Sequence, residues 1–541
     1  MSRNIPIHAV SLQKLDEVLE RIKALTSEDD YQIVHTLVTS YRYLFEAYHA
    51  SRQSITKLLR MVFGQKTEKY IPKPSSGSED QGAGEASQQD GTGTASSKRK
   101  KGHGRNGADK YPGAHRVSVS HEKLKAGEPC PECPRGKLYP LNRPAVLLSL
   151  YSRAPVDATV YELEQLRCNG CQQVFTAQAP PEAGSRKYAQ SAAVMMALLK
   201  YGSGMPFFRL AALQRSLGIP LPESTQWDVV SGLAQELKPI WKSLLSQAAN
   251  APVLHNDDTT AQILQRTREL QTLSQEDRKR GRTGTFTTAV MAQTAEGRIA
   301  LYFTGARHAG ENLNLLFGHR DPGRPPPVQM CDALSRNIPA DYQVILCNCL
   351  THCRRTFFEL LSSFPEETQH VLTLLKQIYQ HEQQAQEQQL DDHQRLSYHQ
   401  QHSAPIMNEL NAWIKQQQKA RAVEPNSSLG KAFAYTQNHW DSLVQFLKTP
   451  GAPIDNSICE QVIKRFVLFR KSSLFYKTHA GAAVGDLFMS LIHTCELNQV
   501  NPFAYLTTLA RNPQLIAEAP ERWMPWNYQQ TLEQPSAHTV A

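Results

Sequence analysis

At residues 252–259 the chain reads PVLHNDDT, a short apolar run that ends in two adjacent carboxylates. Successive residues of a strand point to opposite faces of a sheet. Val253, His255 and Asp257 would therefore share one face, and Asp258 would point the other way. Of the two carboxylates, Asp257 is the better candidate for a site at the open end of the strand.

Two later segments carry further acidic residues. The segment MCDA, residues 330–333, ends another apolar run in Asp332, and DNSICE, residues 455–460, opens a predicted helix that contains Glu460. Phosphodiester cleavage and strand transfer need an activated hydroxyl and a stabilised leaving oxygen, which two Mg²⁺ ions roughly 4 Å apart supply. Three carboxylates are enough to bind such a pair. We expect Asp257, Asp332 and Glu460 to be catalytic and to bind magnesium, or manganese in its place.

Each acidic residue also has an ordinary structural explanation. Asp257 and Asp332 taken singly suit turns at strand ends, and Ser457 followed by Glu460 matches the capping box of a helix start. Nearby cations favour a functional role, because they would hold DNA phosphates beside the metals. These candidates are Lys464, Arg465, Arg470 and Lys471 after Glu460, and His352, Arg354 and Arg355 in an earlier predicted helix. The alternatives are a solvated basic face and, for His352, a structural hydrogen bond.

The surrounding segments predict an α/β fold of the α+β kind. Apolar and β-branched runs predict strands at 252–257, 285–292, 299–304, 328–332 and 344–348, and helices at 311–317 and 351–361. This order is that of a ribonuclease H-like core whose second helix is very short. The catalytic core would span residues 249–365 and 450–485, with a Gln-rich helical insertion at 366–449 and a helical C-terminal segment at 486–541.

Several regions precede this core. Residues 1–70 show coiled-coil periodicity, which suits DNA binding or dimerisation but equally a helical hairpin closed on itself. Residues 187–248 suggest a helix-turn-helix-like bundle that either contacts DNA or is scaffolding. Residues 71–112 are polar and predict a flexible linker. Its cations would be available to phosphate, unless they only solubilise the chain: Lys98, Arg99, Lys100, Lys101 and Arg105.

Two Cys-x-x-Cys pairs lie in residues 113–186, separated by a β-prone stretch. Each pair supplies two thiolates from a tight turn, and four thiolates bind zinc tetrahedrally. The spacing predicts a zinc ribbon whose closed site is structural, with redox chemistry as the alternative. The predicted zinc ligands are Cys130, Cys133, Cys168 and Cys171.

Length and composition narrow the class of protein. The chain has 541 residues, a net charge of +9 and 40% hydrophobic residues, which fits several soluble domains with a polyanionic partner. The longest apolar run, residues 192–199, is far shorter than the roughly 20 residues that cross a bilayer. The first residues lack the apolar stretch of a secretory signal. We expect a cytoplasmic protein without a membrane partner.

Further motifs are spread along the chain. They are FGQKTE at 63–68, GHGR at 102–105, NDDT at 256–259, DNSICE at 455–460, FRKSSLF at 469–475, LNQVNPFAYL at 497–506 and MPWN at 524–527. In this order they resemble the motifs of transposases of the insertion-sequence-66 family, which are bacterial enzymes with an Asp-Asp-Glu site. Two positions depart from the family's pattern. Ala333-Leu334 replaces a usual Gly-Tyr after the second acid, and Gln461 replaces a usual Arg after the third.

The resemblance implies that the chain moves an insertion sequence, by a cut-and-paste or copy mechanism. Its partners would be double-stranded DNA, both the element's terminal inverted repeats and the target, and often two small accessory proteins encoded alongside. We expect a homo-oligomer. Two other classes remain: a catalytically inactive zinc-ribbon protein that binds DNA and regulates, and a ribonuclease H-like nuclease without strand transfer.

Overall fold

The computed structural model describes residues 18–40 except 20, 24, 26 and 28, and residues 125–129, 137–138, 154–167, 174–183, 186–274 and 282–533. The chain divides into two units, Met1–Glu122 and Lys123–Ala541. In the first unit residues 29–40 are helical. The predicted linker cations and the four predicted zinc ligands lie outside the described residues.

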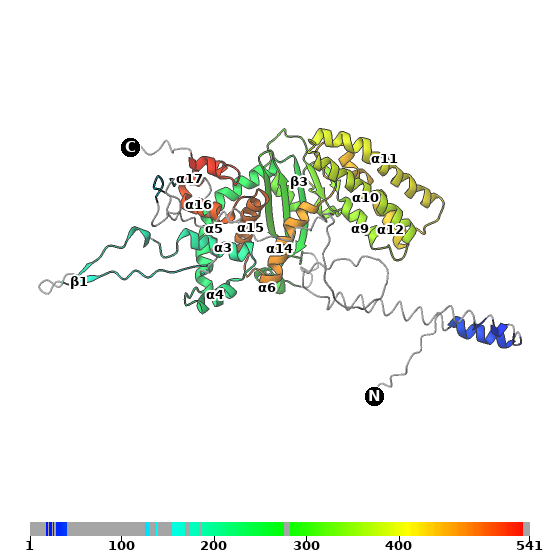
Figure 1. The fold of residues 1–541 in the computed structure, drawn as a ribbon, viewed down its shortest axis with the longest axis horizontal. Helices are drawn as coiled ribbons and strands as arrows, with labels where there is room; N and C mark the ends of the chain where they lie inside the picture. The colour runs from blue at the N-terminus through cyan, green and yellow to red at the C-terminus, as the bar shows by residue number, and fades with distance from the viewer. Residues whose placement is uncertain are drawn as a thin grey trace, which may run out of the picture. The chain divides into compact units, whose positions relative to one another are not determined.

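The second unit is built on a five-stranded mixed sheet with the strand order β5-β4-β3-β6-β7 (Figure 1). β3 pairs antiparallel with β4, and β4 pairs antiparallel with β5. On its other side β3 pairs parallel with β6, which pairs parallel with β7. The strands are β3 Val253–Thr260, β4 Phe286–Gln293, β5 Arg298–Gly305, β6 Val328–Cys331 and β7 Ile345–Asn348. The five predicted strands and their three-strand antiparallel start are confirmed.

Short helices connect the strands beyond β5. α8, Ala309–Phe317, lies between β5 and β6, and the 3-10 turn η4, Ser335–Asn337, lies between β6 and β7. η4 occupies the position at which the sequence predicts a very short second helix. α9, Leu350–Phe358, follows β7 and ends three residues before the predicted limit. Both faces of the sheet are covered: α14, Ser457–Ser473, packs on the face of β3 that carries His255, and α8 packs on the face that carries Asp258.

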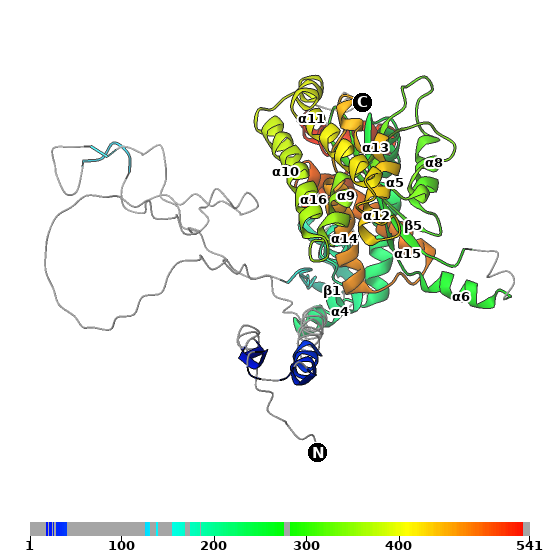
Figure 2. The same ribbon diagram turned by 90° about the vertical axis from the view of Figure 1, so that its right-hand side faces the viewer.

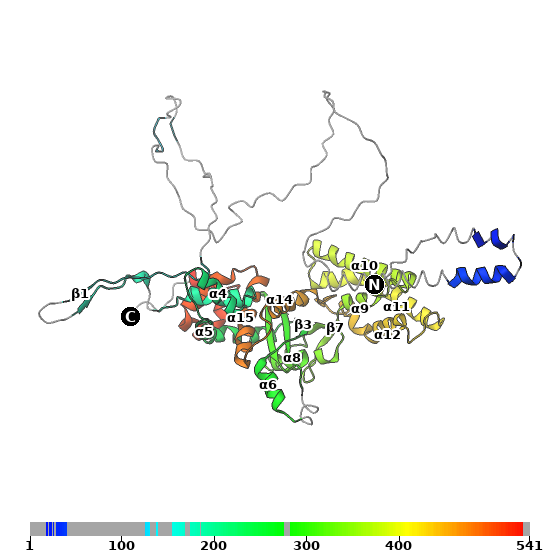
Figure 3. The same ribbon diagram turned by 90° about the horizontal axis from the view of Figure 1, so that it is seen from below.

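Two groups of helices extend the core on either side of the sheet (Figures 1 and 3). One buried cluster joins β3, β4 and β5 to the helices before the sheet and to those near the C-terminus, and the other joins β6 and β7 to the helices of the Gln-rich region. The first group contains α3 Gln190–Ala197, the π-helix η3 Leu198–Gly202, α4 Phe207–Ser216, α5 Glu223–Ala249, α15 His479–Leu497, α16 Pro502–Arg511, α17 Pro513–Glu518, η6 Pro520–Trp523 and α18 Tyr528–Glu533. The second contains α10 Pro365–Glu387, α11 Asp392–Lys419, α12 Ser428–Asn438, α13 Trp440–Leu443 and η5 Gln445–Leu447.

Outside these layers lie a few smaller elements. α6, Leu264–Thr272, follows β3, has no buried residue and projects away from the sheet (Figure 2). β1, Gln165–Arg167, pairs antiparallel with β2, Val174–Thr176, and η2 spans Pro181–Ala183. In the described part of the chain no helix is long and apolar enough to cross a membrane.

Strand β5 is an edge of the sheet, and α15 closes that edge. A free edge strand exposes a row of backbone N–H groups to which other chains can pair. Side chains spaced one helical turn apart accept hydrogen bonds from every second N–H group of β5. The pairs are Thr304 to Asp486 (2.7 Å), Tyr302 to Ser490 (3.1 Å), Ala300 to Thr494 (3.1 Å) and Arg298 to Asn498 (3.0 Å). Side chains of α15 and of Asn498 therefore supply hydrogen-bond acceptors to the edge N–H groups of β5, as a sixth strand would.

The acidic member of this row makes the stability of the fold depend on pH. Burial raises the pKa of Asp486 to about 7, although Thr304 donates two hydrogen bonds to it. A raised carboxyl pKa contributes stability that is complete below the unfolded value of about 4 and is lost as pH rises through the folded value. The neighbouring Tyr201 and Tyr476 have raised pKa values and stay neutral in this range.

We predict that Asp486→Asn removes this pH dependence, because the amide is uncharged, its oxygen can accept from the Thr304 N–H group and its nitrogen can donate to the Thr304 hydroxyl. Between about pH 5 and about pH 8 the free energy of unfolding should fall more in the wild type than in the variant. Urea denaturation at both pH values measures the difference. An equal decrease in the free energy of unfolding for the two proteins would show that burial does not raise the pKa of Asp486. Asp441→Asn, at a carboxylate that is 95% exposed, serves as the control.

Candidate active site

The parallel pairing of β3 with β6 places Asp257 next to Asp332. His255 is opposite Met330 in this register, so two residues further along Asp257 and Asp332 are neighbours, one position beyond the end of β6 at Cys331. Neighbouring strands lie about 4.8 Å apart. Two residues that are 75 positions apart in the sequence thus share the same end of the sheet.

Glu460 reaches this position through the first turn of α14. Asn456, directly before the helix, is buried and donates from Nδ2 to the carbonyl of Asn256 (3.0 Å), while its Oδ1 lies 3.1 Å from His255 Nδ1. One turn on, the Cys459 thiol donates to the carbonyl of Ala289 (3.5 Å), the residue opposite Asp257 on β4. These contacts fix the start of α14 against β3 and β4.

The capping-box explanation of Glu460 is wrong. The N-cap of α14 is Asn456 and has no side-chain cap hydrogen bond, so Ser457 is already the first helical residue. The backbone N–H of Ser457 is bonded to Asp455 Oδ1 (3.0 Å). The Oε1 atom of Glu460 is buried and has no hydrogen-bond partner among the described residues. A buried carboxylate oxygen without a donor is costly unless a cation accompanies it.

The electrostatics of Asp257 and Asp332 point the same way. Burial, and then the charge of Asp332, raise the pKa of Asp257 to about 7, and Glu460 adds to this. Burial also raises the pKa of Asp332, against the opposing effects of His352, Arg336 and the Asn337 side chain, which donates to its carboxylate. His352 and Arg336 lower the pKa of Asp332, but their effect does not outweigh that of burial. Oxygen donors in this number and with this charge are the ligands that Mg²⁺ or Mn²⁺ prefers.

The adjacent carboxylate, Asp258, faces the other side of the sheet. It is 4% exposed and accepts hydrogen bonds from Thr288 Oγ1 (2.6 Å) and from the backbone of Ala309 (3.0 Å). His308 Nδ1 lies 3.2 Å from its second oxygen. Asp258 therefore ties β3 to β4 and to the start of α8, and both of its oxygens take part in these structural contacts.

His352 and Cys349 adjoin the carboxylates. The sequence reasoning singled out His352 but missed Cys349. Cys349, His352 and Glu460 each place one ligating atom within 4.8 Å of the other two. His352 Nδ1 is buried without a hydrogen-bond partner among the described residues, and burial raises the pKa of the Cys349 thiol. Sequence reasoning also missed Asn337 and Asn456, whose roles depend on which strands meet.

The predicted phosphate-binding residues of the core differ in what they contact. Arg354, Arg355, Lys464 and Lys471 are exposed, and Arg354 lies over the ring of Phe358 (5.6 Å). Arg465 forms an ion pair with Glu496 (3.1 Å). Arg470 donates to the carbonyl and hydroxyl oxygens of Thr260, where it joins the end of α14 to the end of β3. These contacts leave Arg465 and Arg470 less available to DNA than the others.

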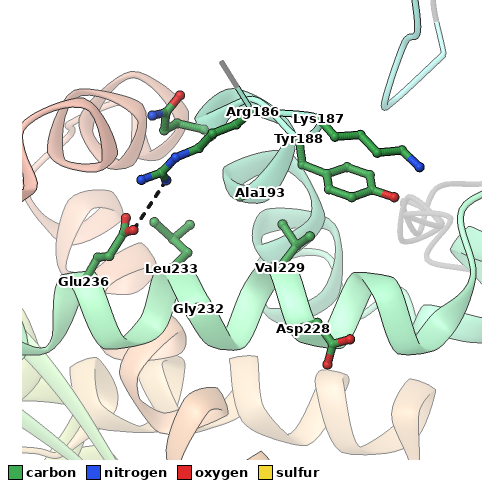
Figure 4. Close-up of a pocket in the computed structure, with 10 residues that line it drawn as sticks. Arg186, Lys187, Tyr188, Ala193, Asp228, Val229, Gly232, Leu233 and Glu236 are labelled. Carbon is green, nitrogen blue, oxygen red and sulfur yellow. Dashed lines mark ion pairs between the residues drawn. The ribbon is translucent and has the colours of Figure 1, made fainter. Parts of the chain in front are cut away.

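A separate pocket lies between α5 and the segment before α3 (Figure 4). Arg186 and Glu236 form an ion pair in it (3.5 Å), and Lys187 and Asp228 also line it. Two cations and two carboxylates balance, so this pocket does not favour a polyanion. None of the predicted site residues lines it.

Comparison with known proteins finds a matching family model and several similar proteins. Residues 187–484, more than half of the chain, match the family model described as transposase IS66 family. The uncharacterized protein y4jD of Sinorhizobium fredii (strain NBRC 101917 / NGR234) is 26% identical over 381 residues, which cover 67% of this chain and 70% of that protein. The uncharacterized protein y4hP of the same strain is 25% identical over 401 residues, covering 70% of this chain and 68% of its own length.

Proposed function

The chain belongs to the IS66 family of transposases, and we propose that it cleaves DNA and transfers the freed strand in a reaction that requires Mg²⁺ or Mn²⁺. The proposal is carried by the electrostatic coupling of Asp257 to Asp332 and Glu460 at one end of a mixed sheet, together with Glu460 Oε1, which is buried without a hydrogen-bond partner among the described residues. We also propose that the sheet is a ribonuclease H-like core, since its strand order and short connections agree with that fold.

The residues of the site have distinct roles in this proposal. Asp257, Asp332 and Glu460 would hold the two metal ions, which when bound activate the attacking hydroxyl and stabilise the leaving oxygen. Asn337 orients the carboxylate of Asp332 by donating to it. Asn456 holds the first turn of α14 against β3, and this fixes where Glu460 projects.

Charge around the site would position the substrate. The exposed Lys464 and Lys471 on α14 and the exposed Arg354 and Arg355 on α9 would bind the phosphates of double-stranded DNA. His352, next to Glu460, would contact the metal shell or a phosphate. Arg465 and Arg470 would act first as structural cations.

The N-terminal part of the chain would recognise the ends of the element. We propose that Cys130, Cys133, Cys168 and Cys171 bind a structural zinc ion. The linker cations would bind phosphate without sequence preference, and the N-terminal helices would pair two copies of the chain. From the family resemblance we also propose that small accessory proteins encoded alongside are partners of the chain.

Incubation of purified protein with duplex DNA of the element's ends, in Mg²⁺, in Mn²⁺ and in EDTA, tests the function. Nicked DNA together with joined products, with either metal but not in EDTA, would support transposition. Nicks without joined products would indicate a nuclease. Binding without any nick, in Mg²⁺ and in Mn²⁺ alike, would refute catalysis and leave a regulatory DNA-binding protein.

A further inference from the structure

The chain leaves α14 through a strained turn. Leu474 has φ 65° and ψ −51°, and the backbone N–H of Phe475 donates to the carbonyl of Ser473 (2.8 Å). This is a γ-turn of the form with positive φ, which is rare and unfavourable for a residue with a side chain. A glycine would adopt the turn without strain, but the chain places a leucine there.

Contacts on both sides of the turn enforce this conformation. Before it, the Leu474 N–H donates to Arg470 (2.7 Å), whose side chain is bonded to Thr260 at the end of β3. After it, Tyr476 is buried and forms a parallel bridge with Ile263, with hydrogen bonds of 2.9 Å to Gln262 and from Leu264. The two residues of the turn that lie between these anchors are thus held in place.

Burial does not compensate for the strain. Leu474 is 61% exposed and Phe475 is 37% exposed, so the turn presents two apolar side chains to solvent. Lys471 and Lys477 on either side of the turn are exposed as well. A rigid apolar tip between cations suits a ligand with an apolar interior and a negatively charged outside, and DNA has both features in its stacked bases and its phosphates.

The position of the tip relative to the carboxylates is set by α14. Glu460 is in the first turn of this helix and Leu474 is its C-cap. With a rise of about 1.5 Å per residue, the two residues are separated by about 20 Å along the helix axis. A duplex that lies along α14 would span this separation in about six base pairs, at about 3.4 Å per step.

We propose that Leu474 and Phe475 form a wedge that unstacks bases of the bound DNA about six base pairs from the cleaved phosphate. Lys471 and Lys477 bind the phosphates on either side of the wedge. The proposal rests on the proposed function, because DNA must occupy the carboxylate site for the tip to reach it. A contact between two copies of the chain is the alternative for the same apolar tip, and the flanking cations disfavour it.

Fluorescence of 2-aminopurine tests the wedge, since this base brightens when it is unstacked. The probe is a duplex of the element's terminal sequence with one 2-aminopurine, moved position by position, bound in Ca²⁺ so that no cleavage is needed. We expect the full-length protein to raise the fluorescence most near the sixth base pair. Leu474→Gly combined with Phe475→Ala should lose this rise and weaken binding by about tenfold. Leu515→Ala, at a leucine that is 40% exposed on α17, should keep both.

The outcomes separate the wedge from the catalytic proposal. Fluorescence rises in the double variant equal to those of the wild type would overturn the wedge, even if the wild type cleaves DNA. A fluorescence rise in the wild type without any cleavage in Mg²⁺ would instead refute the catalytic proposal and would still support the wedge. A double variant that changes only its oligomeric state, seen by light scattering, would show that the tip contacts another copy. Because Leu474→Gly relieves strain at an exposed position, it should not lower the thermal unfolding temperature.

Discussion

If Asp257 and Glu460 bind the catalytic metals as proposed, Asp257→Asn and Glu460→Gln should each slow Mg²⁺-dependent DNA cleavage by at least about a thousandfold, because each would remove a ligand that contributes several kcal/mol to the transition state. DNA binding should persist, since the cations that hold phosphate are unchanged. The measurement is the rate of nicking, beside a gel-shift affinity. Asp441→Asn, at an exposed carboxylate on α13, should cleave like the wild type. Full cleavage by Glu460→Gln would refute the assignment.

Asp257→Asn should also change stability in a direction that an ordinary structural carboxylate would not. Burial and the neighbouring Asp332 raise the pKa of Asp257 to about 7, so the charged form destabilises the metal-free fold above that pH. Asp257→Asn should therefore unfold at a higher temperature than the wild type at about pH 8 without metal. Adding Mg²⁺ should stabilise the wild type and not the variant, because only the wild type binds it.

Asp258→Ala should destabilise the fold by about 3 kcal/mol, although the residue is adjacent to Asp257. The change leaves the buried Thr288 hydroxyl and the Ala309 N–H without their acceptor. It also removes the contact with His308 at the start of α8. Urea denaturation measures the loss, and Asp257→Ala is the matched control at the next position. A loss of stability in Asp257→Ala and none in Asp258→Ala would mean that the two side chains have exchanged faces.

Local pattern explains why much of the core could be predicted. Period-two alternation separated Asp257 from Asp258, because a strand that is buried between β4 and β6 must direct alternate side chains to opposite faces. The apolar runs also identified the five strands. The zinc ligands and the linker cations lie outside the described residues and stay predictions.

The capping box failed for a reason that is not local. Its sequence pattern is present at Ser457 and Glu460, but Asn456 forms bonds with His255 and Asn256 two hundred positions away, which move the helix start by one residue. Arg465 and Arg470 were likewise predicted from charge density alone. Their partners, Glu496 and Thr260, come from other elements.

The sequence by itself determined which residues form strands, which carboxylates end them and which family the motifs resemble, because each of these depends on neighbours along the chain. Only the tertiary structure decided that Asp332 and Glu460 come close enough to raise the pKa of Asp257, that Cys349 and His352 lie beside Glu460, and that Leu474 is held in a strained, exposed turn. Those arrangements follow from strand register, from the hydrogen bonds of Asn456 and from the bridge at Tyr476. Each joins segments far apart in the chain, and the spacing of residues within a segment carries no information about such contacts.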